Sequence, residues 1–406
     1  MDLHSGLPYW LIKNQLFNFH NPLKEPLVVD VAIIGSGITG ALVAHELCSA
    51  GIPCAVFDKR TIATGSTGAS TAQLQYEIDV PLSDLIGKVG EENAVRAYQA
   101  SLQSIADLEQ VFDETAVRSN FKRVSSVFLA SNQRGFRLLE REYEVRKRHG
   151  LPVSFLDADA LFAAHRITAP GALKNTTAAQ MDGYLAATGL LKHHMKKSDL
   201  KLFSHTEIVN YQERKGGYEL LTGDGVIIKC KYVVIAAGFE AGQFLPKRVM
   251  DLNSTYALVS QPVMASQLWP ERSLIWETST PYFYMRTTPD NRMMIGGEDV
   301  PFRNPEARDR LLRWKIKRLE RKFSKVYPDI PFVVDMAWCG TFSTTRDGLP
   351  FIGPWPGRKR MYFALGYGGN GITFSMIAAQ LIKNELIGGV KDEREKVFAF
   401  NRMDSI

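Results

Sequence analysis

The order of hydrophobic and polar positions along the chain predicts a mixture of helices and strands. Three apolar, β-branched runs are typical of strands buried on both faces of a parallel sheet: residues 28–34, 52–57 and 232–236. Apolar residues at spacings of three and four predict four helices: residues 91–116, 134–149, 181–197 and 305–327. Aromatic-rich, alternating segments predict an antiparallel sheet instead: residues 256–264 and 282–297.

A glycine turn joins the first of these strands to an apolar-periodic helix. Gly35 permits a tight turn, Gly37 lets the backbone approach a pyrophosphate, and Gly40 lets the helix pack close to the strand. Asp58 ends the second strand, where a carboxylate accepts hydrogen bonds from a ribose diol. The pattern predicts a dinucleotide site for either FAD or NAD. The alternative is a βαβ unit whose glycines serve packing only.

Three other segments are rich in small residues. The stretch 65–71 offers many backbone N–H groups and hydroxyls and almost no bulk, which favours a cofactor-lining loop over a surface loop. Residues 236–238 leave room for a ligand at the end of a buried strand. Residues 368–371 precede a second apolar helix, so a second helix N-terminus is expected to face a cavity built from glycines.

Length and charge limit the possible number of domains and the possible partners. A chain of 406 residues exceeds the size that one core usually supports, so two domains are expected. The net charge of +6 is weak evidence for an anionic partner, because 49 basic and 43 acidic residues are interspersed. No apolar run reaches the length of a membrane span, and the N-terminus lacks the order of a signal peptide. We therefore expect a cytoplasmic protein with no integral membrane segment and no nucleic-acid partner.

Cysteine and histidine spacing favours neither disulfides nor a metal site. The four cysteines include no CxxC pair and are expected to behave as small buried hydrophobes. His193 and His194 are adjacent in a predicted helix, so they diverge by about 100°. The basic helix 305–327 has two interpretations, a solvated face on a packed helix or a membrane-surface helix, and the first is favoured.

Taken together, the motifs resemble those of the D-amino-acid oxidase family of flavoproteins, which includes glycine oxidase, sarcosine oxidase and related amine oxidases. The resemblance rests on six motifs: GSGITG with Asp58, GSTGAS, VVIAAG, RMMIGGED, TRDGLPFIGP and GYGGNGIT. It implies FAD as the cofactor and an α/β fold, with a Rossmann-like parallel sheet in a discontinuous FAD-binding domain. That domain is expected over residues 1–90, 176–243 and 337–406. An inserted α+β substrate domain with an antiparallel sheet is expected over 91–175 and 244–336.

The resemblance also assigns residues to roles. Gly35, Gly37 and Gly40 are implied to hold the pyrophosphate and Asp58 the adenosine ribose, while Tyr284 and Arg286 are similar to positions that face the substrate. The remaining expected cofactor-binding residues are the neighbour of Asp58, the flavin-lining loop, the end of the third strand and the pyrimidine edge: Lys59, Ser66, Thr67, Ala69, Gly238, Gly369, Asn370 and Gly371.

Three positions depart from the family pattern. Many members that oxidise amino acids carry an arginine that forks the substrate carboxylate, and Phe342 stands at that place, with Arg346 four residues later. Met294 stands where sarcosine-type members have a lysine near the flavin. Cys339 is one residue out of register with the cysteine that attaches flavin in those members, and one residue in a strand is the opposite face. Non-covalent FAD is therefore expected.

The resemblance predicts an FAD-dependent oxidoreductase that transfers a hydride from the carbon beside the nitrogen of an amine or N-substituted amino acid to flavin N5. A small-molecule amine is the expected substrate, with oxygen or an electron carrier as the acceptor. Two alternatives remain open. One is a dehydrogenase of a hydroxy acid or polyol that passes electrons to a quinone or a carrier protein, and the other is an FAD-binding partner subunit without catalysis of its own.

Overall fold

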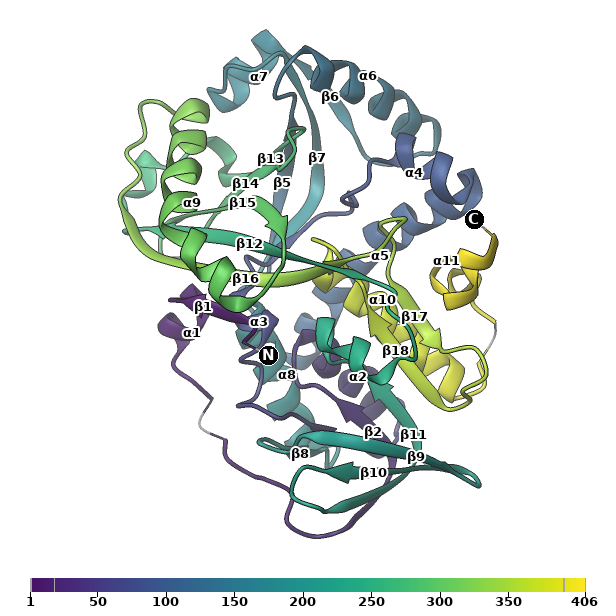
Figure 1. Cartoon of the computed structure of the whole chain (residues 1–406). Coiled ribbons are helices and arrows are strands. Elements are labelled where there is room, and N and C mark those ends of the chain that lie inside the picture. The colour runs from purple at the N-terminus through teal and green to yellow at the C-terminus, as the bar shows by residue number, and fades with distance from the viewer. Residues whose placement is uncertain (1, 18, 390, 406) are drawn as a thin grey trace.

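Two large sheets organise the chain (Figure 1). The computed structural model describes residues 2–17, 19–389 and 391–405. The first sheet, low in the view, has eight strands, in the order β17 (Phe351–Pro354), β18 (Met361–Leu365), β11 (Ile227–Ile235), β2 (Leu27–Ile34), β3 (Cys54–Phe57) and β8 (Lys201–Phe203), with β10 (Gly217–Thr222) and β9 (Ile208–Arg214) added beside β11. Strands β18, β11, β2, β3 and β8 pair in parallel, which confirms the predicted Rossmann-like sheet.

The side chains of β2 show why this strand lies at the centre of the sheet. Val31 and Ile33 point into one core with the helices, and Ala32 and Ile34 point into another on the opposite face. A strand that is buried on both faces has no polar alternation, which is the pattern seen in the sequence. The carboxyl ends of β2, β3 and β11 therefore meet at one edge of the sheet, where α/β proteins bind ligands.

Eleven α-helices and four 3₁₀ helices are found in the described residues. The α-helices are α1 (Tyr9–Asn14), α2 (Ile38–Ser49), α3 (Ser66–Ala69), α4 (Leu82–Val89), α5 (Glu91–Thr115), α6 (Gln133–Arg148), α7 (Ala158–His165), α8 (Gly183–Lys197), α9 (Pro305–Val326), α10 (Gly371–Leu386) and α11 (Arg394–Phe398). The 3₁₀ helices are η1 (Gly238–Phe244), η2 (Ala265–Gln267), η3 (Pro270–Arg272) and η4 (Phe400–Ser405). Helix α2 packs between α8 and α10. The four helices predicted from the sequence are α5, α6, α8 and α9, and their ends agree within two residues.

The second sheet has ten strands and occupies the upper half of the view (Figure 1). Its order is β1 (His4–Gly6), β16 (Val334–Thr344), β12 (Asp251–Ser260), β15 (Met293–Pro301), β14 (Phe283–Thr287), β13 (Leu274–Glu277), β5 (Lys122–Leu129), β7 (Gly171–Gln180) and β4 (Gln73–Leu74), with β6 (Ser154–Asp157) beside β7. The sheet is antiparallel, as predicted, except that β13 and β5 pair in parallel. Helix α9 packs on β12, β15 and β16 through buried Leu319 and Phe323.

The strands cross the domain boundaries expected from the sequence. The boundary at 176 falls inside β7 and that at 337 falls inside β16. Strands β1 and β4, which lie within residues 1–90, belong to the second sheet. The N-terminal segment is therefore shared by both halves, and Trp10 is fully buried, with its indole N–H donating to the Ser70 carbonyl at 2.7 Å.

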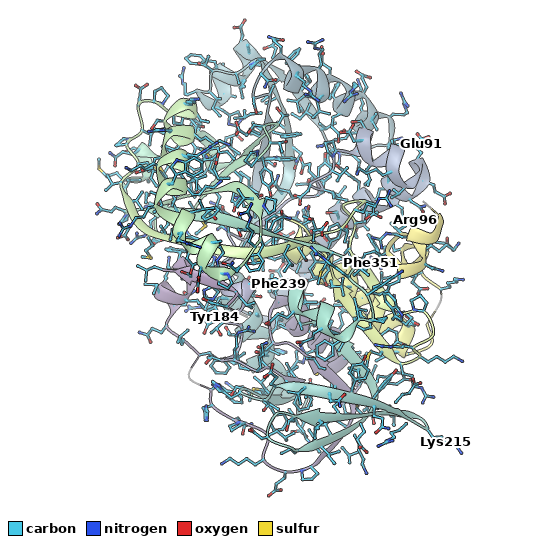
Figure 2. All side chains as sticks on the ribbon, viewed as in Figure 1. Glu91, Arg96, Tyr184, Lys215, Phe239 and Phe351 are labelled. Carbon is cyan, nitrogen blue, oxygen red and sulfur yellow. The ribbon has the colours of Figure 1, made fainter. Side chains whose placement is uncertain are left out.

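Figure 2 shows Lys215 at the far tip of the β9–β10 hairpin, well away from the junction of the two sheets. Throughout the described ranges, no helix has both the length and the apolar character needed to cross a membrane.

Candidate active site

The glycine turn after β2 is tight enough to exclude any other residue at two positions. Gly35 has φ +111°, and a Cβ there would lie 2.4 Å from the Ala236 carbonyl oxygen. A Cβ on Gly40 would lie 1.9 Å from the carbonyl oxygen of Gly35. Gly37 stands at the start of α2, and its missing side chain leaves the N-terminus of that helix open to a cavity. This is the arrangement that receives a pyrophosphate in dinucleotide-binding folds.

Asp58, at the end of β3, fixes the shape of this turn. Its carboxylate accepts hydrogen bonds from the Ser36 backbone N–H at 2.9 Å, from the Ser36 hydroxyl and from the Arg60 N–H at 2.9 Å. The Ser36 hydroxyl in turn accepts from the Ala63 N–H at 3.0 Å. Asp58 still lines the cavity, so its carboxylate is positioned beside the turn where a ribose diol binds in this fold.

Lys59 also lines the cavity, but its ammonium group is occupied. It forms ion pairs with Glu240 at 2.9 Å and with Glu207 at 3.5 Å. Arg60 pairs with the other oxygen of Glu240 at 2.8 Å. Glu240 belongs to η1, which begins at Gly238 with φ +57° at the carboxyl end of β11. Both cations at this end of the cavity are therefore paired with carboxylates.

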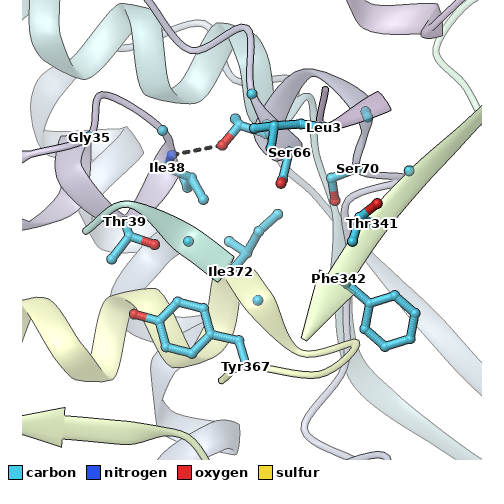
Figure 3. A pocket seen from close by; sticks show the side chains of 18 of the residues that line it. Leu3, Gly35, Ile38, Thr39, Ser66, Ser70, Thr341, Phe342, Tyr367 and Ile372 are labelled. Atoms are coloured by element: carbon cyan, nitrogen blue, oxygen red, sulfur yellow. Dashed lines mark hydrogen bonds between the residues drawn. The ribbon is translucent and has the colours of Figure 1, made fainter. Parts of the chain in front are cut away.

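The loop that carries α3 closes over the N-terminus of α2 (Figure 3). The Thr67 hydroxyl accepts the Ile38 N–H at 2.9 Å, and Ser66 and Ala69 line the cavity next to it. The Trp338 indole N–H donates to the Ala69 carbonyl at 2.8 Å, so the loop is held from the second sheet as well as from the first. Figure 3 shows Thr341 and Phe342 of β16 across the cavity from Gly35 and Ile38.

The C-terminal glycines form another side of the same cavity. Asn370 is 8% exposed, donates to the Glu77 carbonyl at 2.7 Å and accepts the Asp79 N–H at 3.2 Å. Gly371 begins α10, and a Cβ there would meet open space. The N-termini of α2 and α10 thus face one cavity, and their helices are joined by a contact of 2.8 Å between the Thr39 and Ser375 hydroxyls. Two positive helix ends and a glycine-built wall fit a dinucleotide diphosphate and an electron-accepting ring.

The structure brings almost all of the expected cofactor residues together. Gly40 lies just beneath the glycine turn, and the others line one cavity: Gly35, Gly37, Asp58, Lys59, Ser66, Thr67, Ala69, Gly238, Gly369, Asn370 and Gly371. Tyr284 lines it from the second sheet. Its ring lies over Gly296 of the neighbouring strand, where a Cβ would be 2.3 Å from the tyrosine oxygen. That contact accounts for the first glycine of the RMMIGGED motif.

Arg286 does not reach the cavity. Its side chain is 1% exposed, and one guanidinium nitrogen donates to the backbone carbonyls of Thr71, Ala72 and Met181 at 2.7, 2.8 and 2.9 Å. We expected Arg286 to face the substrate, but its side chain lies behind the loop that follows α3. Arg346 is exposed outside the cavity, and Phe342 lines it.

The sequence analysis did not identify one wall of the cavity, which faces the loop that follows α3. Residues 73–79 read QLQYEID, and the polar members of this alternation, Gln73, Gln75, Glu77 and Asp79, all line the cavity. The apolar members between them are buried. Strict alternation of this kind signals one polar and one apolar face. It was hidden because only two residues of the segment form a regular strand, β4.

Two carboxylates and three aromatic residues define what we call the acidic wall: Glu77, Asp79, Trp276, Tyr282 and Tyr284. The Asp79 side chain is exposed within the cavity, and its carboxylate accepts the Gly369 N–H at 2.6 Å. Burial raises the pKa of Asp79, and this hydrogen bond lowers it by a smaller amount. Burial, with the nearby charge of Asp79, also raises the pKa of Asp299, behind the wall, to about 6.

None of the cysteines lines the cavity. Cys339 is fully buried in the core between β16 and α9, and its thiol lies 3.2 Å from an Asp309 carboxylate oxygen. The Sγ atoms of Cys48 and Cys54 lie 3.6 Å apart, and all four cysteines are free thiols. Met294 is fully buried beneath the second sheet. The described residues contain no group of three His, Cys, Asp or Glu side chains that could hold a metal ion.

Comparison with known proteins agrees with this geometry. The family described as FAD dependent oxidoreductase (DAO) matches residues 30–384. Glycine oxidase of Geobacillus kaustophilus is 26% identical over 87% of this chain and 91% of its own length. Gamma-glutamylputrescine oxidoreductase of Escherichia coli is 26% identical over 98% of this chain and 92% of its own length.

Solved structures share the fold. The crystal structure of glycine oxidase from Geobacillus kaustophilus superposes with a TM-score of 0.76 at 21% identity, covering 90% of this chain and 96% of that one. L-proline dehydrogenase from P. horikoshii superposes with a TM-score of 0.77 at 19% identity, covering 94% of this chain and 99% of that one. The two-sheet architecture is therefore shared with these solved structures.

Proposed function

Because the chain belongs to the DAO family of FAD-dependent oxidoreductases, we propose that it oxidises the C–N bond of an amine or N-substituted amino acid. When bound, FAD accepts the hydride that leaves the carbon beside the nitrogen. The residues fitted to hold FAD are those of the glycine turn, Asp58, the α3 loop and the start of α10. The imine that results from loss of the hydride is released and hydrolyses.

The observation that carries this proposal is the charge of the cavity beyond the cofactor cradle. The cationic lining residues are Lys59 and Arg60, and both lie at the strand ends near Glu240. The acidic wall has carboxylates and aromatic rings instead. A hydroxy acid or a phosphate ester is an anion and requires a charge-assisted donor, whereas an ammonium group is attracted by this wall.

The chain's own groups have definite tasks in this reaction. The substrate nitrogen must be neutral before its neighbouring carbon loses a hydride, so a proton has to leave the ammonium group. Asp79 is positioned to hold the ammonium, and its raised pKa makes it a better proton acceptor than an ordinary surface aspartate. The rings of Trp276, Tyr282 and Tyr284 line the same wall and give the substrate an apolar surface.

Anaerobic reduction of the bound flavin tests the proposal. The visible absorption of the holoenzyme should bleach with members of a panel of primary and secondary amines. It should not bleach with hydroxy acids or polyols of the same size. Bleaching by hydroxy acids or polyols alone would favour the dehydrogenase alternative, and an unreactive flavin with every compound would favour a partner subunit. Repeating the reaction in air, with oxygen consumption recorded, identifies oxygen or a carrier as the acceptor.

A further inference from the structure

We propose that Asp79 and the aromatic rings around it bind the ammonium group of an alkylamine that carries no carboxylate beside its nitrogen. This inference rests on the proposed amine oxidation and narrows it, because it separates simple amines from N-substituted amino acids. Four observations support it: the placement of Asp79, a second carboxylate that shares its arginine partner with Glu142, the aromatic rings, and the lack of a cation for a substrate anion.

Asp79 is held in place by the backbone and not by a charge. The Gly369 N–H donates to one of its oxygens at 2.6 Å. A Cβ on Gly368 or Gly369 would lie 2.6 Å from a carboxylate oxygen of Asp79, so the GYGGNG sequence leaves room for this side chain. Within the described residues Asp79 has no ion-pair partner among the lysines and arginines. A single N–H donor leaves the negative charge of a carboxylate largely unpaired, and a cation that enters the cavity can pair with it.

Glu77 adds a second, partly balanced negative charge to the wall. Its side chain lines the cavity and is 4% exposed, and its Oε2 atom has no hydrogen-bond partner. Its other oxygen accepts from Arg146 at 3.3 Å and from Asn175 at 2.6 Å. Arg146 also pairs with buried Glu142 at 2.8 Å, so one guanidinium serves two carboxylates. Burying the excess negative charge is costly unless a cation comes close or the group is protonated.

Aromatic rings complete the wall. The ring centroids of Tyr282 and Tyr284 lie 5.8 Å apart, and a Cβ on Gly369 would be 3.1 Å from the Tyr282 hydroxyl oxygen. Trp276 is fixed by stacking on Phe128, with centroids 3.6 Å apart. Burial raises the pKa of both tyrosines, so their hydroxyls remain neutral and their rings remain available to a cation. A carboxylate in the same place would meet Asp79 and have no guanidinium to bind, since Phe342 lines the cavity and the resemblance to the family implies an arginine at its position.

A binding experiment with three compounds of the same shape tests the inference without catalysis. The tert-butylammonium ion has no C–H bond on the carbon beside its nitrogen, so it can bind but cannot be oxidised. The alcohol tert-butanol is its neutral counterpart, and trimethylacetate is its anionic one. Each compound is titrated into the FAD-loaded wild-type protein, and binding is followed by calorimetry and by the flavin absorption band. The cation should bind at least tenfold more tightly than tert-butanol or trimethylacetate. Equal affinities, or tighter binding of the anion, would overturn the inference.

A variant then assigns the site to Asp79. Asp79→Asn keeps the size of the side chain and an acceptor for the Gly369 N–H, and should weaken tert-butylammonium binding at least tenfold. Asp30→Asn, an exposed carboxylate on β2 that pairs with Lys231, is the matched control and should leave binding unchanged. Unchanged affinity in Asp79→Asn would contradict the inference.

The proposed reaction and the ammonium site can fail separately. If amines bleach the flavin but the three-compound series shows no preference for the cation, the proposed reaction stands and the ammonium site is wrong. If tert-butylammonium binds through Asp79 but no amine reduces the flavin, the site stands and the proposed reaction is wrong.

Discussion

At the scale of single residues, Gly37 is the position where one added side chain should decide cofactor binding. A Cβ there would lie 2.9 Å from the Thr67 hydroxyl oxygen, the atom that accepts the Ile38 N–H. The methyl groups of valine would extend into the space in front of the α2 N-terminus. We therefore expect Gly37→Val to be purified with little or no FAD, measured as the ratio of visible to protein absorbance.

The control for this variant is a glycine inside a different helix, away from the cavity. Gly87 lies within α4, a Cβ there would have no atom within 4 Å, and alanine at this position should raise stability by about 0.5–1 kcal/mol. Gly87→Ala should therefore retain full FAD. A normal FAD content in Gly37→Val would show that the glycine turn does not hold the pyrophosphate.

Phenylalanine at position 342 leads us to expect poor activity on small amino acids. An arginine that forks a carboxylate supplies hydrogen bonds worth about 1.5–3 kcal/mol each, and phenylalanine supplies none. Glycine and D-alanine should therefore be poor substrates, with kcat/KM below that of the best simple amine by roughly 10²-fold or more, at about 1.4 kcal/mol per tenfold. Steady-state kinetics with glycine, D-alanine and the best simple amine measures this ratio. Efficient turnover of glycine would mean that another cation binds the carboxylate.

At the scale of elements, α4 depends on a carboxylate from α6. Helix α4 has no side-chain cap of its own, and Glu142 accepts the N–H groups of Leu82 and Ser83 at 2.8 and 2.9 Å. Glu142 also pairs with Arg146, and both side chains are fully buried. Arg146 keeps Glu77 as a second partner at 3.3 Å, so neutralising Glu142 weakens charge-assisted hydrogen bonds worth about 1.5–3 kcal/mol each without leaving the guanidinium unpaired. Glu142→Gln should lower the unfolding temperature, measured by calorimetry, while Glu144→Gln on the exposed face of α6 should not.

The pH dependence of that effect has a definite sign. Burial raises the pKa of Glu142, but Arg146 and the two N–H groups lower it by more, so the net shift is downward. A lowered pKa in the folded protein means that the stabilisation is present above the unfolded-state pKa of about 4.3 and is lost as the pH falls through the folded value. The difference between wild type and Glu142→Gln should therefore be largest near neutral pH and narrow below about pH 4.

The N-terminus of α10 should act on the flavin. A helix N-terminus stabilises a nearby anion by roughly 0.3–2 kcal/mol, which is about a 2- to 30-fold change in an equilibrium. Sulfite adds to a flavin when the ring's negative charge is stabilised, so sulfite affinity reports on this helix. Gly371→Val places a side chain in open space in front of α10 and should weaken sulfite binding while FAD stays bound. Unchanged affinity would show that α10 does not face the ring; Gly369→Val is a poorer test because its Cβ would strike Asp79.

Local pattern was sufficient to predict the elements that have long, regular periods. The β2 strand is apolar on both faces and α5 is periodic over 25 residues, so the core dictates both. The carboxylates of the acidic wall, Glu77 and Asp79, were missed because their alternation spans residues 73–79 and only β4 in it is regular. The place of Arg286 depends on three carbonyl groups from other segments, and no local pattern contains that information. The parallel pairing of β13 with β5 is likewise set by the long connection between them.

At the scale of the whole molecule, the cavity is assembled from segments that are far apart in the sequence. The glycine turn, the α3 loop, η1, β16 and the start of α10 all line it, and they belong to both sheets. A ligand that contacts all of them stabilises only the folded chain. Its binding therefore contributes to global stability by mass action, about 2.7 kcal/mol at a free concentration of 100 times Kd.

The positions of the cysteines across the whole molecule predict how FAD is held. The chain has four cysteines, and a covalent flavin link through sulfur needs a thiol at the cavity. Cys48, Cys54 and Cys230 lie in α2, β3 and β11, and none of the three lines it. Cys339 lies one residue before Gly340, which does line it, and the Cys339 thiol points to Asp309 on the other face of β16. Because every thiol is buried away from the cavity, unfolding should release the cofactor intact. Acid precipitation of the yellow protein should leave the flavin in the supernatant, and the polypeptide should have its unmodified mass; a yellow pellet with a flavin-bearing peptide would contradict non-covalent binding.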